Sequence, residues 1–519
     1  MKKAIYLIIA LIGLSAPSCS DSMLDFSPTD SGSGKELLKS ASTAITSVNG
    51  VYRSMWTAGW STTANTHQCF GIAAYNLALD CMADDLIMQS QGNGWFWGDH
   101  CYNVKSNYTS SAFRSYDVWY ANYKWIANVN YIIDAEPEMA GTEADVAYVA
   151  GQAYAIRALC YLNLATWFSR APYNSLTGAS RWNELCVPVY TTGTSIDTGG
   201  QPRESLRTVY GRIDQDIDRA IELLEKARET TLAENNKSHI NLYVALGIKS
   251  RACLAEGDWD GAFKAAKRVI DEGGYAVGTK SDLTGGMNSL DKQNVMWGAG
   301  IQVADQAGGY AGFFTHMDNK EGAYAKSAPK LISKQLYNRI SATDIRRDWW
   351  DPSDKESPYV SKKFSFANVA SFLGDYIYMR VEEMYFTAAE AALRLDDLKS
   401  ARELMNTVMA ERDPGYSANN RSGTLLGATT TTWTGSFLEN ILTHRRIELW
   451  GEYGRLFDVR RLGQGIDRRT DDGFSEECIS MMNNRNVNIT KADTYDWVLT
   501  IPKAELDANP NINEEDQNP

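Results

Sequence analysis

Two stretches of the chain share one pattern of small, apolar and acidic residues at a constant offset of 139 positions. The first is INLYVALGIKSRACLAEGDWDGAFKAAKRVID, which begins at Ile240, and the second begins at Met379. At this offset Ala252 aligns with Ala391 and Asp258 aligns with Asp397. Each copy predicts a helix, a short turn that contains Asp, and a second helix that begins with small residues.

Small residues at fixed positions let paired helices pack closely, which is typical of tetratricopeptide repeats with their period near ~34 residues. The two copies are not in tandem, so we expect helix pairs within a larger fold. Three further segments, 117–138, 145–167 and 209–228, have apolar residues at alternating spacings of three and four. The first two are expected to form an antiparallel hairpin. We therefore predict a mainly α fold in which four tetratricopeptide-like helix pairs form a curved slab.

Between these segments the helical periodicity fails over long stretches. Gly, Ser, Asn and aromatic residues dominate residues 56–115, 171–204, 274–376 and 414–435, with short strand-like pieces such as VMWGAGIQVAD. Long irregular segments within a compact domain usually carry function. The expected architecture is therefore a helical scaffold with long irregular loops and a few short strands on the opposite side of the slab.

The first residues predict export. Two lysines precede an apolar run from Ala4 to Leu14, which is too short to span a bilayer, and small residues follow up to Cys19. This layout favours a lipoprotein signal peptide over residues 1–18 with acylation of Cys19, whereas a plain cleaved signal is the alternative. Residues 19–34 are rich in Ser, Asp and Gly and predict a flexible tether. Residues 35–519 then form a single domain with loop insertions at about 56–115 and 274–376.

Charge and motifs exclude several classes of function. The net charge of −13 and the absence of a basic tract argue against a nucleic-acid partner. Seven further cysteines are widely spaced without a CxxC pair, which indicates neither a disulfide framework nor a zinc site. The five histidines lack ligand spacing, and no HExxH, GxSxG or complete phosphate loop occurs. We expect no catalytic residues, no metal site and no cofactor.

An aromatic loop stands out at residues 93–108, NGWFWGDHCYNVKSNY. An exposed Trp or Tyr ring can cover the C–H face of a sugar while its N–H or O–H group reaches polar atoms. The alternative is that the rings fill a gap over the helices, as most aromatic residues do. The nearby Gly92, Gly94 and Gly98 favour exposed rings, because glycine loosens the backbone. A second loop, GGYAGFFTHMDN, would complete the platform.

Several blocks of the chain, in this order, resemble the SusD/RagB family of outer-membrane nutrient-binding lipoproteins. They are SCSDSMLDFSPTD, GQAYAIRALCYLNLATWFSRAPY, YMRVEEMYFTAAEAALRLDDLKSARELMNTVMAERDPGY, HRRIELWGEYGRLFDVRRLG and LTIPKAELDANPNIN. The resemblance covers essentially the whole chain.

The resemblance implies a protein that is lipid-anchored in the outer membrane through Cys19 and faces the cell exterior. Such a protein would cover a TonB-dependent barrel transporter of the SusC type, bind oligosaccharides and deliver them for import, without being an enzyme. Ligand-binding residues implied by the order of the loops are Asn93, Trp95 and Trp97, followed by Tyr102, Tyr310 and Phe314.

Three alternatives stay open at this point. The chain could be a secreted glycan-active enzyme, a tetratricopeptide scaffold for protein partners, or a SusD-like binder of a non-glycan nutrient such as a peptide. The charged block RRIELWGEYGRLFDVRR is another possible binding site. Its spacing instead favours ion pairs on helix surfaces and between elements, so we interpret it as fold-defining.

Overall fold

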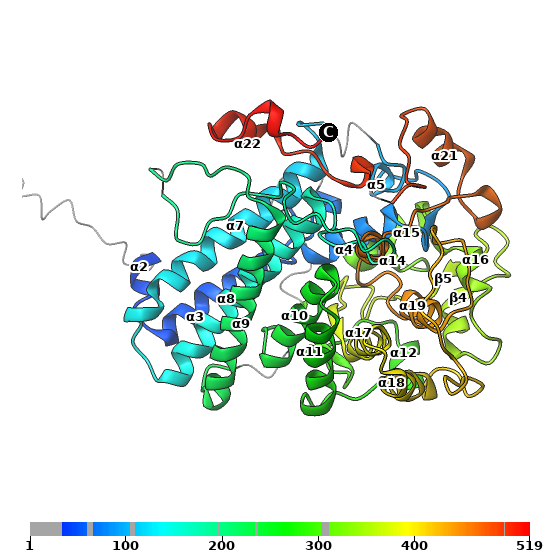
Figure 1. Ribbon diagram of the computed structural model, residues 1–519, viewed down its shortest axis with the longest axis horizontal. Coiled ribbons are helices and arrows are strands. Elements are labelled where there is room, and N and C mark those ends of the chain that lie inside the picture. The colour runs from blue at the N-terminus through cyan, green and yellow to red at the C-terminus, as the bar shows by residue number, and fades with distance from the viewer. Residues whose placement is uncertain are drawn as a thin grey trace, which may run out of the picture.

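The computed structural model describes residues 34–59, 66–103, 109–195, 197–233, 237–302, 311–492 and 494–519. The predicted signal peptide and Cys19 lie outside these ranges. Long helices pack side by side on one side of the molecule, and short helices and strands gather on the other (Figure 1). Within the described ranges, no helix is both long enough and apolar enough to cross a membrane.

The longest helix, α8 (Glu143–Phe168), lies at the centre of the row. It packs against α3 (Ala41–Ser54), α7 (Phe113–Ala135) and α9 (Leu206–Lys226), which confirms the predicted hairpin of α7 and α8. We expected α8 to bury one apolar face. Instead, residues on most sides of α8 are buried, because several helices pack around it. Gly151 faces α9 so closely that an added Cβ would lie 2.9 Å from Leu224 Cγ.

The two aligned stretches fold as predicted into helix pairs, α10 (Leu242–Glu256) with α11 (Trp259–Glu272) and α17 (Val381–Arg394) with α18 (Leu398–Ala410). Their turns are equivalent in detail. Gly257 and Asp396 occupy matching positions and both are left-handed, with φ of 77° and 62°. The next residue, Asp258 or Asp397, accepts a hydrogen bond from the backbone N–H three residues later and caps the second helix.

The repeated pairs lie against each other, since α11 packs on α17 and α10 packs on α9 (Figure 1). The next helix in the chain, α19 (Phe437–Glu448), also packs on α17. The row of helices thus continues from α7 to α18 across gaps in the sequence. This arrangement confirms the predicted mainly α fold with tetratricopeptide-like helices.

Short strands lie in the regions where helical periodicity fails. A four-stranded sheet has the order β1 (Leu86–Met88), β3 (Lys330–Ile332), β5 (Val360–Ser361), β4 (Trp350–Asp351), with antiparallel neighbours. The predicted strand in VMWGAGIQVAD is β2 (Val295–Ala299), which pairs antiparallel with β6 (Tyr376–Arg380).

The remaining elements are short. The α-helices are α2 (Gly34–Leu37), α4 (Ile72–Met82), α5 (Trp97–His100), α12 (Lys280–Thr284), α14 (Phe313–Met317), α15 (Ala323–Ser327), α16 (Lys334–Tyr337), α20 (Arg455–Leu462), α21 (Glu476–Asn483) and α22 (Lys503–Ala508). The 3-10 helices are η2 (Thr66–Gln68), η3 (Glu136–Glu138), η4 (Ala227–Glu229), η6 (Ile345–Trp349), η7 (Thr470–Asp472), η8 (Tyr495–Trp497) and η9 (Glu514–Asp516).

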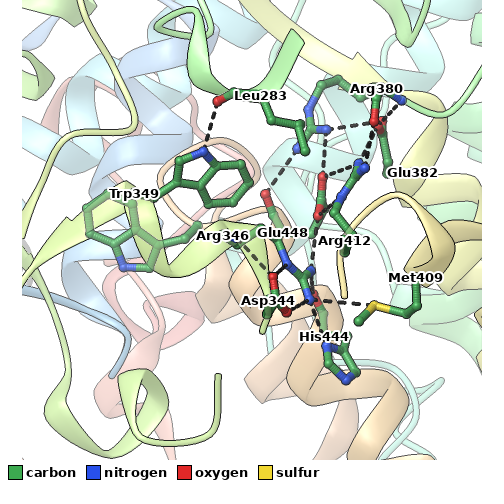
Figure 2. Close-up of polar contacts among 12 residues, drawn as sticks. Leu283, Asp344, Arg346, Trp349, Arg380, Glu382, Met409, Arg412, His444 and Glu448 are labelled. Carbon is green, nitrogen blue, oxygen red and sulfur yellow. Dashed lines mark hydrogen bonds and ion pairs between the residues drawn. The ribbon is translucent and has the colours of Figure 1, made fainter. Parts of the chain in front are cut away.

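The charged block around α19 and α20 forms ion pairs inside the molecule. Glu448 is fully buried, and its Oε1 accepts hydrogen bonds from Arg380 Nη1 at 3.0 Å and Arg412 Nη2 at 2.9 Å (Figure 2). Its Oε2 accepts from Arg346 Nη1 at 3.0 Å and from Arg412 Nε at 2.9 Å. The predicted pairs between elements are confirmed, whereas their expected place on helix surfaces is wrong because the block packs between α17 and the irregular region.

Burial by itself disfavours a charged Glu448 carboxylate. The surrounding Arg412, Arg380 and Arg346 reverse this effect and hold the pKa of Glu448 well below its ordinary value. The carboxylate is therefore ionised, and each oxygen accepts two charge-assisted hydrogen bonds. This network locks segments that are distant in sequence and leaves no open side for a ligand.

Candidate ligand-binding site

The described part of the aromatic loop, residues 93–103, follows β1 and contains α5, on the side of the molecule away from α8 (Figure 1). Figure 1 shows α5 close to α14 and α15, which come from the second aromatic region. The ring of Phe96 meets the imidazole of His316 edge-on with ring centres 5.0 Å apart, so the two aromatic loops meet directly. The structure thus brings together the two loops that the sequence proposed as one platform.

Glycine has a different role here from the one expected. Gly92 and Gly94 have φ of 51° and 88°, a conformation that other residues rarely adopt. A Cβ on Gly92 would lie 2.7 Å from Ala328 Cβ and 2.7 Å from the Ser327 carbonyl oxygen. The expectation that these glycines loosen the loop is wrong, since they permit a tight turn pressed against the end of α15.

Trp95 is the ring that the structure leaves partly exposed. Its indole stacks on the imidazole of His67, with ring centres 5.0 Å apart and planes at 25°. The ring of Tyr324 meets the indole edge-on at 6.1 Å. The His67 imidazole therefore covers one face of the Trp95 indole, while the residue as a whole is partly exposed. We name Trp95, His67 and Tyr324 the Trp95 platform.

Hydrogen bonds among its members and to His316 hold the Trp95 platform in place. The hydroxyl of Tyr324 lies 2.6 Å from His67 Nδ1, and His316 Nε2 donates to the His67 carbonyl at 2.6 Å. Burial lowers the pKa of His316 well below its usual value, so this imidazole is neutral. The indole thus rests on side chains with fixed orientations, which reduces the entropy lost when a ligand binds.

The backbone after Trp95 is fixed as firmly. Phe96 is buried in a left-handed conformation, with φ of 61°, and its N–H donates to Gln68 Oε1 at 2.8 Å. Behind it, Arg114 donates to both carboxylate oxygens of Asp99 at 3.0 and 2.8 Å. Burial lowers the pKa of Arg114, but the Asp99 carboxylate outweighs this effect and raises it above the usual value. The loop is a rigid support.

Three of the rings that were predicted to contact a ligand are buried instead. The side chains of Trp97, Tyr102 and Phe314 are 4%, 0% and 2% exposed, so they offer no open face to a ligand. Trp97 begins α5 and packs near His100, while Tyr102 donates its hydroxyl proton to the Met82 carbonyl. These rings fill the space over the helices, which is the alternative that the sequence left open.

The other predicted residues have different outcomes. Asn93 is exposed in the turn that precedes Trp95, where its amide is accessible to a ligand. Phe314 packs against Tyr376 and Phe366 in the core. Tyr310 lies outside the described residues. Asn93 and Trp95 remain the predicted ligand contacts.

Sequence reasoning missed His67 and Tyr324, which support Trp95. Neither belongs to a motif: His67 lies in η2, 28 residues before Trp95, and Tyr324 lies in α15, far along the chain. Across the described ranges, no group of three or more His, Cys, Asp or Glu side chains is placed to hold a metal ion. The chemistry available at the Trp95 platform is stacking and hydrogen bonding.

The helical slab and the loop-borne Trp95 platform define a helical-repeat protein with a small aromatic face. Two family models match the chain: one described as "SusD family" over residues 326–519, and one described as "Starch-binding associating with outer membrane" over residues 43–254. The chain belongs to the SusD family. No protein with curated annotation matches the chain.

Solved structures extend the likeness to nearly the whole chain. A SusD-like carbohydrate binding protein from Bacteroides vulgatus has 24% identity and a TM-score of 0.73, covering 92% of this chain and 98% of its own. A SusD superfamily protein from Bacteroides thetaiotaomicron has 22% identity and a TM-score of 0.73, covering 92% and 100%. Surface glycan-binding protein A from the same species has 16% identity and a TM-score of 0.63, covering 93% and 99%. At these identities the likeness establishes the fold.

Proposed function

We propose that this protein binds oligosaccharides at the cell surface, with the partly exposed ring of Trp95 as the principal contact. The observation that carries the proposal is a partly exposed indole, stacked on His67 and held by fixed polar contacts, in a member of the SusD family. The names of similar structures, a carbohydrate binding protein and a surface glycan-binding protein, support the same ligand class.

The physical basis is the match between an indole and a pyranose. The C–H face of the sugar removes apolar indole surface from water, and the sugar hydroxyls stay at the rim where polar groups can reach them. Asn93 supplies both an amide donor and an amide acceptor beside the ring. One stacked sugar gives weak binding on its own, so a longer oligosaccharide with several contacts binds more tightly.

Anchoring and delivery form the second half of the proposal. Cys19 carries the lipid that attaches the protein to the outer membrane, facing the cell exterior, and a SusC-like TonB-dependent transporter receives the bound sugar. The resemblance of the N-terminal block and the family description support this arrangement. Purification of the tagged protein from solubilised membranes should retain a barrel transporter, and purification without any such partner would contradict the delivery step.

The direct experiment is a calorimetric titration with a panel of neutral oligosaccharides. Trp95→Ala should weaken the binding of the best ligand at least about tenfold, the equivalent of roughly 1.4 kcal/mol. Trp182→Ala is the matched control, because Trp182 is another partly buried indole, packed near Arg207 and away from the loop. Equal affinity of the wild-type protein and Trp95→Ala would refute the proposed site.

Three assays on the purified protein separate the remaining alternatives. A peptide that binds where no oligosaccharide does would assign a non-glycan nutrient. Release of shortened sugars by the purified protein would indicate a glycan-active enzyme. Binding of a protein partner that survives Trp95→Ala but requires the helical slab would indicate a scaffold.

A further inference from the structure

Two cysteines that are far apart in the sequence meet in the folded molecule. Cys101 directly follows α5 in the aromatic loop, and Cys478 lies in α21. The side chains of these two residues form a hydrogen bond to each other. A disulfide forms only where two cysteine side chains can bring their sulfur atoms within about 2.05 Å of each other. The spacing of the cysteines along the chain indicates no disulfide framework, but the fold places this pair in contact.

Other contacts hold α5 and α21 together at this point. Cys478 Sγ lies 3.7 Å from the carbonyl oxygen of His100, although the two residues are 378 positions apart. The imidazole of His100 stacks on the ring of Phe474, with ring centres 5.7 Å apart and planes at 12°. The side chains of Cys101 and Cys478 are both 0% exposed. The two sulfur atoms are thus held next to each other in the interior.

A guanidinium lies beside this pair of sulfur atoms. Arg468 Nη1 is 3.8 Å from Cys478 Sγ, and the same nitrogen donates to the His100 carbonyl. The hydrogen bond from Cys101, together with His100 and Arg468, lowers the pKa of Cys478 well below its usual value, although burial opposes this. The same hydrogen bond raises the pKa of Cys101. Cys478 is therefore the member of the pair that carries the reactive thiolate.

The segment that contains Cys101 has a strained backbone. Phe96 and Tyr102 lie on either side of α5, and both are left-handed, with φ of 61° and 52°. Residues other than glycine rarely adopt this conformation. Trp95 directly precedes the segment. A covalent link at Cys101 would hold the segment in the conformation that supports Trp95.

We propose that Cys101 and Cys478 are joined by a disulfide in the exported protein, so that the aromatic loop is linked covalently to α21. The proposal rests on the export that the first residues predict, because disulfides form and persist in oxidising compartments outside the cytoplasm. It does not rest on the ligand proposed for Trp95.

The oxidant is a thiol oxidase of the cell envelope, a protein with a reactive disulfide, which acts as α21 docks on α5. The Cys478 thiolate attacks one sulfur of that disulfide, and a mixed disulfide forms while the second sulfur of the oxidase leaves as a thiolate. Cys101 then gives its proton to that thiolate, attacks Cys478 Sγ and displaces the oxidase. The oxidase leaves as a thiol and a thiolate, and it has gained two electrons and one proton.

The test is mass spectrometry of the full chain, isolated from the cell envelope of a bacterium that exports it. The chain is denatured, free thiols are blocked with N-ethylmaleimide, disulfides are reduced, and the released thiols are labelled with iodoacetamide. We expect Cys101 and Cys478 to carry the second label. Cys160 of α8 should carry the first, because burial alone raises its pKa and it is a thiol outside the pair. A digest without reduction should contain the peptides of Cys101 and Cys478 joined.

Alanine variants measure what the link contributes. Cys101→Ala and Cys478→Ala should each lower the midpoint of thermal unfolding by about 5 °C. The double variant should lower it little further, because either substitution alone removes the link. Wild-type protein refolded with dithiothreitol should show the same loss, and neither single variant should respond to dithiothreitol. Cys160→Ala is the matched control, since it removes a buried thiol and should respond to dithiothreitol as the wild-type protein does.

Three results would overturn the proposal. They are Cys101 and Cys478 that carry the first label in chain taken from the envelope, a disulfide that joins either of them to another cysteine, and a wild-type midpoint that dithiothreitol does not change. Retention of the chain in the cytoplasm is a distinct outcome, which would contradict the predicted export and the disulfide together.

Discussion

At the scale of single residues, neighbouring side chains of the same type have opposite roles. Trp95 is partly exposed, whereas Trp97 is buried at the start of α5. The left-handed backbone of Phe96 turns the chain between them. Such a conformation costs roughly 1–2 kcal/mol in a residue other than glycine. Burial of the Phe96 ring and its hydrogen bond to Gln68 offset this cost.

Gly92→Ala tests whether the loop is held rigidly. The added methyl meets Ala328 and Ser327 at 2.7 Å, and φ is 51°, so the turn must shift. Denaturant unfolding should show a loss of about 1–3 kcal/mol, and the affinity for the oligosaccharide should fall. Gly178→Ala is the matched control, since Gly178 also has positive φ but open space around it. Equal losses in the two variants would contradict a tightly packed turn.

Glu448→Gln tests the buried ion network. Removing one charge leaves three guanidinium groups without their shared carboxylate, so the free energy of unfolding should fall by about 3–5 kcal/mol. The exposed ion pair of Glu222 with Lys226 provides the comparison, and Glu222→Gln should have no measurable effect. Urea unfolding monitored by circular dichroism measures both variants.

At the scale of elements, the sequence predicted the helices well and their surroundings less well. The period of apolar residues and the Asp at each repeated turn are local signals, so α10, α11, α17 and α18 could be placed from sequence. The burial of α8 on most of its sides is set by the helices that pack around it, so the sequence of α8 alone did not predict it. The support of Trp95 by His67 of η2 and Tyr324 of α15 likewise depends on contacts between separate elements, which no local pattern reports.

The equivalent turns of the two repeats allow a pair of reciprocal substitutions whose effects on stability can be predicted. Asp396 and Gly257 share a left-handed backbone, which glycine adopts without strain. Asp396→Gly should therefore raise the free energy of unfolding by up to about 1 kcal/mol. Gly257→Asp should lower it by more, because a Cβ there would lie 2.5 Å from the ring of Tyr173. Thermal unfolding of the two variants would contradict this if both shifted the midpoint in the same direction.

At the scale of the whole molecule, buried carboxylates make the fold sensitive to acid. Burial would raise the pKa of Glu448 and Asp458, but neighbouring arginines lower both below their ordinary values. The folded chain then binds fewer protons than the unfolded chain, so the stability from these groups is present above a pH of about 4.5 and is lost as the pH falls further.

The expected result is a stability that drops steeply below a pH of about 4.5. Glu448→Gln, which has no proton to take up at this position, should lose less stability over the same range than the wild-type protein does. Urea midpoints measured at about pH 6, 5, 4 and 3 provide the comparison. Parallel curves for the two proteins would contradict the assigned pKa shift of Glu448.

In the whole molecule, a helical slab supports one partly exposed aromatic ring, that of Trp95. Ion pairs and helix packing fix the slab, the slab supports the loops, and the loops hold Trp95 in one orientation. The sequence predicted ligand contacts at Asn93 and Trp95, and both residues stay predictions. It overestimated the number of open rings, because burial is set by the tertiary packing around each ring.

The central claim is that a sugar stacks on Trp95, and fluorine NMR of the protein labelled with fluorotryptophan tests it most directly. The Trp95 resonance is assigned by its loss in Trp95→Phe, and the best neutral oligosaccharide is then added. We predict that the Trp95 resonance shifts in proportion to occupancy while that of the buried Trp97 stays nearly constant. Saturable binding that leaves the Trp95 resonance unchanged would contradict the claim.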